Sequence, residues 1–127
     1  MKTALVTGGA GFVGTNLIKR LLKENYKVIS LDNYSTGKKE NEQKGCEYHE
    51  IDLSSEFVRH KIEISHYIEK GIDVIFHLAA LARIQPSLKH PFHHIHNNIQ
   101  GCLNIFEIAR NNNIPVVYAG SSSFHHG

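Results

Sequence analysis

Leu5-Val6-Thr7-Gly8-Gly9-Ala10-Gly11-Phe12-Val13-Gly14 is the stretch that decides the fold of this chain. It is typical of a buried strand that runs into a glycine turn and then into a helix. We expect Gly8 to allow a sharp turn, Gly11 to let phosphates approach the backbone, and Gly14 to let the helix pack closely on the strand. Backbone N–H groups and the positive end of a helix dipole would then meet at one place, which suits a pyrophosphate.

Composition narrows the class of protein. A chain of 127 residues makes one domain, so residues 1–127 are expected to form a single folded unit. The 14 basic and 12 acidic residues are scattered along the sequence and leave a net charge of +2, which favours neither nucleic acid nor a membrane surface as partner. No leader segment and no membrane-length apolar run is evident, and two cysteines make no disulfide framework. We therefore expect a cytoplasmic protein.

The spacing of apolar residues predicts strands that alternate with helices. Beyond the opening strand, the expected elements are a helix over 12–24, a strand over 27–31, a loop over 34–39, a strand over 45–51, a helix from Ser54 or Ser55 to Gly71, a strand over 72–78, a helix over 93–111 and a strand over 115–119. This alternation favours an α/β fold, a Rossmann-type doubly wound parallel sheet of about five strands in the order 3-2-1-4-5. Ligands of such sheets bind at the carboxyl ends of the strands.

An acidic residue stands where a dinucleotide-binding unit needs one. Asp32 ends the second predicted strand and follows Gly14 by 18 residues, close to the ~20 that the fold geometry requires. A carboxylate there can accept hydrogen bonds from the adenosine ribose, although capping of the following turn is the other use of such a residue. Because a carboxylate repels a 2′-phosphate and no arginine adjoins it, Asp32 favours NAD over NADP.

At this point the sequence resembles the extended short-chain dehydrogenases/reductases that epimerise or dehydrate nucleotide sugars. Thr7–Gly14 is similar to the nucleotide-binding motif of that family, and Asp32–Gly37 to its ribose-binding turn. Asn98–Cys102 resembles the family's N-V-x-G-T segment, and Tyr118–Ser123 resembles the serine-rich strand end that carries its catalytic hydroxyl. The resemblance covers essentially the whole chain and implies the N-terminal part of a larger domain, without the substrate domain.

The resemblance implies a set of site residues, with NAD as cofactor and a nucleotide sugar, most simply a UDP-sugar, as substrate. The cofactor-binding residues would be Gly8, Gly11, Phe12, Val13, Gly14, Asp32, Asn33, Ser35, Thr36, Gly37, Asp52, Leu53, Leu78, Ala79, Ala80 and Asn98. Ser121 would be the catalytic serine, with Ser122 and Ser123 on the substrate side, unless these hydroxyls only satisfy backbone groups at a strand end. Hydride would pass to NAD and return to the sugar or be used in elimination.

Two departures from the family pattern leave the activity open. His125 and His126 stand where the family has Tyr-Gly, and the catalytic Tyr-x-x-x-Lys, expected about twenty residues after the serines, is not reached before Gly127. Tyr34 and Lys38 match the motif in letters only, because a turn-rich loop does not put both side chains on one helix face. Three interpretations follow: part of a nucleotide-sugar epimerase or dehydratase, a non-catalytic dinucleotide-binding module, and a carbonyl reductase of the same family.

The remaining polar residues predict no further site. His90, His93, His94 and His96 crowd the start of the long predicted helix, where solvent exposure is a better explanation than a metal, so no metal is expected. Both cysteines are expected to be small core residues. The fifth strand would lie at an edge of the sheet, and with the long helix it would favour self-association, most simply as a homodimer.

Overall fold

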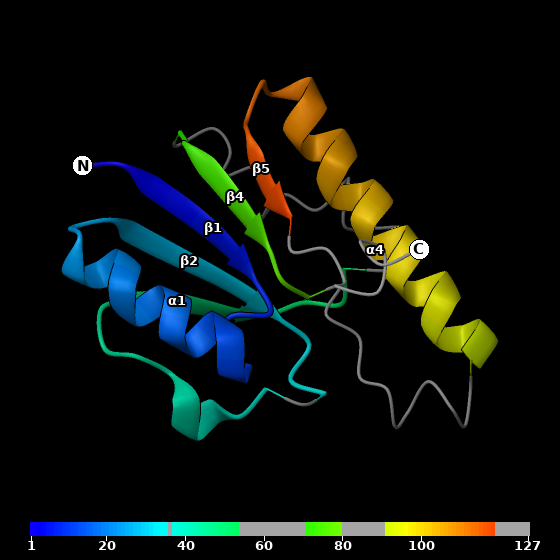
Figure 1. Cartoon of the computed structure of the whole chain (residues 1–127), viewed down its shortest axis with the longest axis horizontal. Coiled ribbons are helices and arrows are strands. Elements are labelled where there is room, and N and C mark those ends of the chain that lie inside the picture. Colours follow the sequence, from blue (N-terminus) through cyan, green and yellow to red (C-terminus); the bar gives the residue numbers. More distant parts are fainter. Residues whose placement is uncertain (36, 54–70, 80–90, 119–127) are drawn as a thin grey trace, which may run out of the picture.

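The computed structural model describes residues 1–35, 37–53, 71–79 and 91–118, and for residues 91–99 it describes only the helical backbone. The elements in chain order are β1 (Thr3–Thr7), α1 (Phe12–Lys23), β2 (Lys27–Asp32), the short 3-10 helix η1 (Lys39–Asn41), β3 (Cys46–Glu50), β4 (Val74–His77), α4 (Pro91–Asn111) and β5 (Val116–Tyr118) (Figure 1). The helix expected over 54–71 lies mostly outside the described residues. No sequence pattern had indicated η1, which lies at the end of the predicted loop.

The strands form one parallel sheet in the order β3-β2-β1-β4-β5, as predicted. β1 is central, and Leu5 lies opposite both Ile29 of β2 and Ile75 of β4. Because all five strands run the same way, their carboxyl ends meet at one edge of the sheet. The glycine turn, Asp32 and the segment after β4 therefore come together at that edge.

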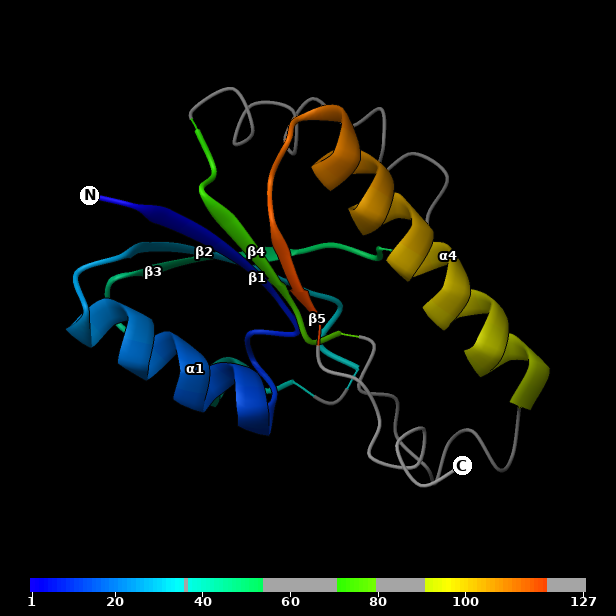
Figure 2. The ribbon, with the colours of Figure 1, turned by 45° about the horizontal axis from the view of Figure 1, so that its top comes forward.

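The sheet is covered on both faces, which explains the continuous apolar run of β1. Side chains alternate along the strand, so Ala4 and Val6 face α1 while Leu5 faces α4. Figure 2 shows the two helices on opposite sides of the sheet. The core on the α1 side contains Ala4, Val6, Ile18, Leu21, Val28 and Leu78. The core on the α4 side contains Leu5, Ile29, Leu31, Ile51, Leu53, Ile72, Ile75, Ile105, Ile108 and Ala109.

Both helices end at an asparagine in the left-handed conformation. Asn25 has φ of 65° after α1, and Asn113 has φ of 53° after α4. In each case the next residue bonds back across the last turn: Tyr26 N–H donates to Leu21 O at 3.0 Å, and Ile114 N–H donates to Ala109 O at 2.9 Å. This pattern satisfies carbonyl groups that a helix end leaves free and redirects the chain into the next strand. Among the described residues, neither helix has the length and apolar character needed to cross a lipid bilayer.

Candidate functional site

The glycine turn begins with the sharp bend that was expected at Gly8. Its φ is 72°, and its N–H donates to Leu31 O of β2 at 2.8 Å. A Cβ at this position would lie 3.0 Å from Ala79 N, so the turn is packed directly against the segment that follows β4. Only glycine satisfies both the positive φ and this contact without strain.

Two further glycines hold α1 close to the sheet. A Cβ on Gly14 would overlap Gly8 O and would come within 2.7 Å of Gly9 Cα, which agrees with the close packing expected there. A Cβ on Gly9 would overlap the hydroxyl of Ser30 on β2, a contact that sequence reasoning missed. Ser30 Oγ is buried, and among the described residues no hydrogen-bond partner reaches it.

The N-terminus of α1 is open to a ligand. Gly11 caps the helix with φ of −80° and ψ of 179°, and the first turn contains no acidic residue and receives no side-chain cap. The first helical bond runs from Thr15 N–H to Gly11 O at 2.9 Å, so the N–H groups of Phe12, Val13 and Gly14 have no acceptor within the helix. A Cβ on Gly11 would meet only Gly8 O, at 3.5 Å, in the described part of the chain. The arrangement suits an anion.

Asp32 lies at the end of β2, beside this turn. Its side chain is 7% exposed; Oδ2 accepts from Ala10 N–H at 2.9 Å and Oδ1 accepts from Tyr34 N–H at 2.8 Å. The carboxylate thus orders the turn and also caps the following loop, the second use considered for it. A carboxylate has about four acceptor sites, so capacity remains for ribose hydroxyls.

The loop after β2 folds over Ala10. The Ala10 carbonyl accepts from Lys38 N–H at 3.2 Å and from the Asn41 side-chain amide at 2.9 Å. Gly37 fits tightly here, because a Cβ added at this position would lie 2.7 Å from Asp32 Oδ2. Asn33 Oδ1 accepts from both the N–H and the hydroxyl of Ser35. Asn41 had not been predicted, since its partner lies 31 positions away and leaves no local pattern.

A buried threonine joins the ends of β1 and β4. Thr7 Oγ1 accepts from Leu78 N–H at 2.9 Å and from Ala79 N–H at 3.0 Å, and it lies 2.8 Å from His77 Nδ1. On the other side of the ring, His77 Nε2 lies 3.3 Å from Cys102 Sγ of α4. Burial lowers the pKa of His77 from 6.5 to about 4, so the ring is neutral at physiological pH. The resemblance had drawn attention to this segment but not to the histidine side chain.

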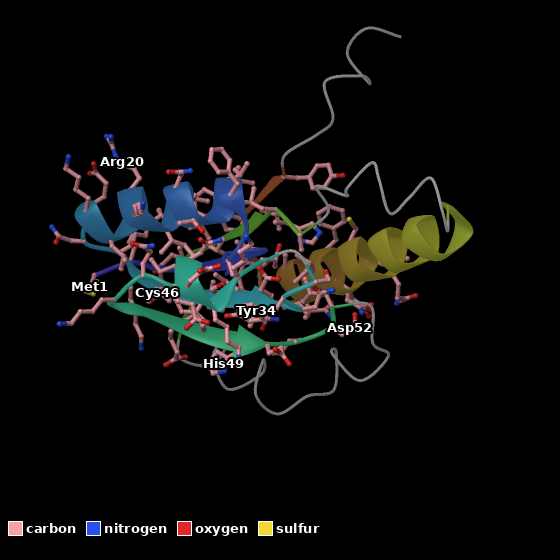
Figure 3. The ribbon with its side chains drawn as sticks, turned by 90° about the horizontal axis from the view of Figure 1, so that it is seen from below. Met1, Arg20, Tyr34, Cys46, His49 and Asp52 are labelled. Atoms are coloured by element: carbon pink, nitrogen blue, oxygen red, sulfur yellow. The ribbon has the colours of Figure 1, made fainter. Side chains whose placement is uncertain are left out.

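The segment that follows β3 is held by another residue that had not been predicted. Leu53 is buried while Asp52 is exposed, and Asn104 of α4 donates to Leu53 O at 2.6 Å. Gln100 in turn donates to Asn104 Oδ1 at 3.1 Å. Asn104 is 1% exposed and directly precedes the core residue Ile105. The only hint of its role in the sequence is therefore a polar residue next to the apolar face of the predicted helix. Figure 3 shows Asp52 and Tyr34 toward the same end of the strands.

Several predicted site residues lie outside the described part of the chain. They are Thr36, Ala80, Ser121, Ser122 and Ser123, and they remain predictions. Asn98 lies within α4, where only the backbone is described. The four histidines around the start of α4 are likewise without a described side chain.

Tyr34 does not have the properties of a catalytic base. Its hydroxyl donates to Glu42 Oε2 at 2.6 Å, and Lys39 Nζ lies 5.9 Å from the ring centre. Burial first, and then the hydrogen bond to Glu42, raise the pKa of Tyr34 above its usual value. A tyrosine that removes a proton at neutral pH needs the opposite shift.

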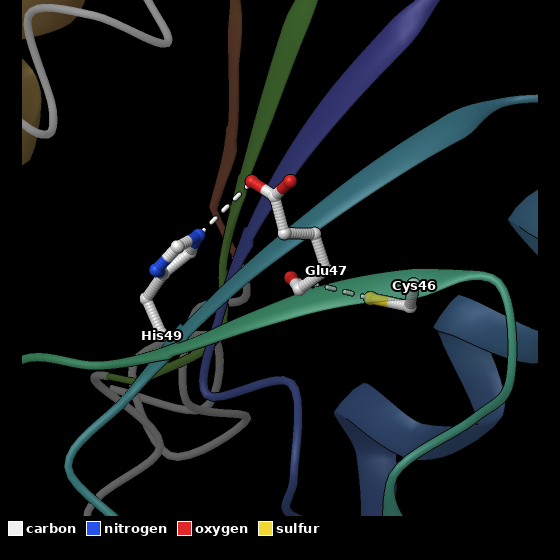
Figure 4. Close-up of polar contacts among 3 residues, drawn as sticks. All are labelled: Cys46, Glu47 and His49. Carbon is white, nitrogen blue, oxygen red and sulfur yellow. Dashed lines mark hydrogen bonds and ion pairs between the residues drawn. The ribbon is translucent and has the colours of Figure 1, made fainter.

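The polar residues of β3 form a separate contact on this outermost strand of the sheet (Figure 4). Glu47 Oε2 lies 2.9 Å from His49 Nε2, and Cys46 Sγ donates to Glu47 O at 3.7 Å. Burial raises the pKa of Cys46 to about 11, which keeps the thiol protonated. Both cysteines are half-buried, rather than the core residues expected, because each lies at the margin of the packed layers. In the described ranges, no three His, Cys, Asp or Glu side chains gather as a metal site would require.

A parallel sheet with strand order 3-2-1-4-5, a glycine turn leading into an open helix N-terminus, and an acidic residue at the end of the second strand together define an α/β fold of the Rossmann type. Comparison with known proteins gives the particular family. The chain belongs to the NAD dependent epimerase/dehydratase family, whose sequence pattern matches residues 4–125.

Individual relatives agree with this assignment. The chain is 35% identical over 124 residues to a putative UDP-glucose 4-epimerase of Methanocaldococcus jannaschii, which covers 97% of this chain and 39% of the relative. Among solved structures, it is similar to the Thermotoga maritima UDP-glucose 4-epimerase with UDP-glucose, at 31% identity and a TM-score of 0.82 over 94% of this chain and 38% of the other. It is also similar to the Thermus thermophilus UDP-glucose 4-epimerase in complex with NAD, at 34% identity and a TM-score of 0.80 over 94% and 37% of the two chains. The chain thus spans about two-fifths of the length of these relatives.

Proposed function

We propose that this chain binds NAD at the carboxyl ends of β1, β2 and β4, and that it is the cofactor-binding part of an enzyme that epimerises or dehydrates a UDP-sugar. The observation that carries the proposal is the open N-terminus of α1. Three N–H groups there lack a helical acceptor, and Gly11 leaves free the space in front of them. The protein has no conformational need for glycine at this position, because its φ of −80° suits any residue. A phosphate that approaches the backbone closely would account for glycine here, because a side chain would stand in its way.

The remaining contacts that we propose are those that the resemblance to the family implies. With the pyrophosphate on the N–H groups of Phe12 and Val13, the adenosine ribose comes to Asp32, whose oxygens retain acceptor capacity. The loop residues Asn33, Ser35 and Gly37 then lie beside the ribose, Asp52 and Leu53 beside the adenine, and Leu78 and Ala79 along the cofactor. The side-chain negative charge at Asp32 selects against the 2′-phosphate of NADP.

We propose further that the 127-residue chain does not turn over a UDP-sugar alone. Bound NAD supplies a hydride acceptor, and the reaction also needs a base for the sugar hydroxyl. The only Tyr-x-x-x-Lys in the sequence is Tyr34 to Lys38, and Tyr34 is unsuited to that role. Incubation with NAD and UDP-glucose, followed by separation of the nucleotide sugars, tests this point. Formation of UDP-galactose at a rate above a blank would show that the chain is catalytic, whereas NAD binding without turnover is the expected result.

Gly11→Ala tests the binding site itself. The added methyl group fills the space in front of the helix end, and we expect NAD binding to weaken by about 1–3 kcal/mol, the usual effect of an inserted methyl. Unfolding in urea should change by less than about 1 kcal/mol, because alanine adopts the same backbone conformation and only the cap preference is lost. Lys19→Ala, on the exposed face of α1, serves as the matched control and should leave the affinity unchanged. Equal NAD affinities of Gly11→Ala and wild type, measured by calorimetry, would remove the pyrophosphate from this turn.

A further inference from the structure

We infer that His77 is a positioning residue for the dinucleotide site: its Nε2-protonated imidazole orients the Thr7 hydroxyl, which in turn holds Leu78 and Ala79 against the glycine turn. The inference rests on the proposed function, because the site being positioned is the proposed NAD site. His77 is 1% exposed, so it acts behind the surface that would face the cofactor.

The hydrogen-bond inventory of Thr7 determines the tautomer of the ring. A hydroxyl offers one donor and two acceptor positions. Both acceptor positions of Thr7 Oγ1 are used, by Leu78 N–H at 2.9 Å and Ala79 N–H at 3.0 Å. Its proton must therefore be donated to His77 Nδ1, 2.8 Å away, so Nδ1 carries no proton. The ring proton then resides on Nε2, from which it is donated to Cys102 Sγ at 3.3 Å.

The surroundings of the ring favour this neutral form. Tyr118 of β5 stacks at 6.0 Å between ring centres, and Phe106 of α4 meets the ring edge-on at 6.1 Å. In the described part of the chain, the titratable groups that face the ring are Cys102 and Tyr118, and neither a carboxylate nor an amine contacts it. Desolvation accordingly lowers the pKa of His77 to about 4.

The hydrogen bonds of Thr7 also show how the His77 ring affects the glycine turn. If Nδ1 gains a proton or is replaced by carbon, Thr7 no longer has an acceptor for its own proton. A protonated ring would instead donate to Thr7 Oγ1 and displace Leu78 N–H or Ala79 N–H. Leu78 N–H has a second acceptor in Thr7 O at 3.2 Å, so the bond to Ala79 is the more easily lost. Ala79 N lies 3.0 Å from the place that a Cβ added at Gly8 would occupy, so displacement of Ala79 changes the packing against the glycine turn.

A pair of variants separates orientation from packing. His77→Asn keeps an oxygen acceptor for Thr7 and loses the donor to Cys102, whereas His77→Phe keeps an aromatic ring and loses the acceptor. We expect His77→Asn to bind NAD within about twofold of wild type and His77→Phe about tenfold more weakly, the effect of one misplaced buried hydrogen bond. Thr7→Val, which removes the hydroxyl at nearly constant volume, should weaken NAD binding as His77→Phe does. Circular dichroism checks that each variant is folded.

Nitrogen-15 NMR of the wild-type imidazole gives a readout that does not depend on any variant. The expected spectrum shows protonated Nε2 and unprotonated Nδ1 at pH 7. A proton on Nδ1, or equal NAD affinities of folded His77→Phe and wild type, would overturn the inference. Rescue by Asn but not by Phe supports it. Failure of the folded wild-type chain to bind NAD would overturn the proposed function. This outcome can be told apart from failure of the His77 inference, because it is measured on wild type alone, before any variant is compared.

Discussion

At the scale of single residues, Asp32 combines two roles whose energies can be separated. It accepts the N–H groups of Ala10 and Tyr34, and it is proposed to accept ribose hydroxyls as well. Asp32→Ala is therefore expected to lower the free energy of unfolding by about 1–3 kcal/mol and to weaken NAD binding by about 1–3 kcal/mol. Urea unfolding and calorimetry measure the two effects. Unchanged affinity in a folded Asp32→Ala variant would remove Asp32 from the binding site.

His77 predicts a dependence of stability on pH. Its pKa is about 4 when folded and 6.5 in the unfolded chain, so the unfolded state takes up the proton first as pH falls. The stabilisation from the neutral ring is complete above pH 6.5 and is lost progressively between pH 6.5 and 4. Over this interval wild type should lose about 3 kcal/mol more than His77→Asn, which shares its carboxylates but lacks the imidazole. If the curves of unfolding free energy against pH were parallel for wild type and His77→Asn, the ring would be protonated as easily in the folded chain as in the unfolded chain.

At the scale of elements, the contact between α1 and the glycine turn predicts unequal tolerance of the glycines. Gly14→Ala forces a methyl group into the backbone of Gly8 and Gly9 and should destabilise the chain by about 1–3 kcal/mol. Gly101→Ala is the matched control inside α4, where the Cβ would meet Leu53 Cβ at an ordinary 3.6 Å. Its helix propensity should stabilise the chain by about 0.5–1 kcal/mol. Thermal unfolding compares the two variants, and a Gly14→Ala variant as stable as wild type would show that α1 and the glycine turn are not in close contact.

The elements also show which features the sequence could predict. Strand order and both described helices were predicted from apolar periodicity, from the alternation of strands with helices, and from the glycines of the turn. The contacts of Asn41, Asn104 and His77 join residues at least 25 positions apart, and no periodic pattern records such pairs. Gly9 was missed for the same reason, since the need for glycine arises from Ser30 on the neighbouring strand.

At the scale of the whole molecule, apolar side chains of α4 and β5 remain exposed among the described residues. Leu103 and Phe106 on α4 and Val117 and Tyr118 on β5 are 40–55% exposed, and β5 is an edge of the sheet. Burial of such surface favours association, so we expect a dimer or larger species whose fraction rises with concentration. Light scattering after size exclusion measures this fraction. Leu103→Glu, which places a charge on the exposed side of α4, should shift the chain to monomer while leaving its thermal unfolding little changed. A wild-type chain that stays monomeric at high concentration would contradict the prediction.

At the carboxyl ends of the strands, the glycine turn, Asp32 and the Thr7–His77 pair are proposed to form one dinucleotide site. The most direct test is calorimetric titration of the folded wild-type chain with NAD and, separately, with NADP. We predict that NAD binds at one site per chain and that NADP binds at least about tenfold more weakly, because the Asp32 carboxylate repels the 2′-phosphate. A folded chain that binds neither nucleotide would show that the carboxyl ends of these strands are not a dinucleotide site.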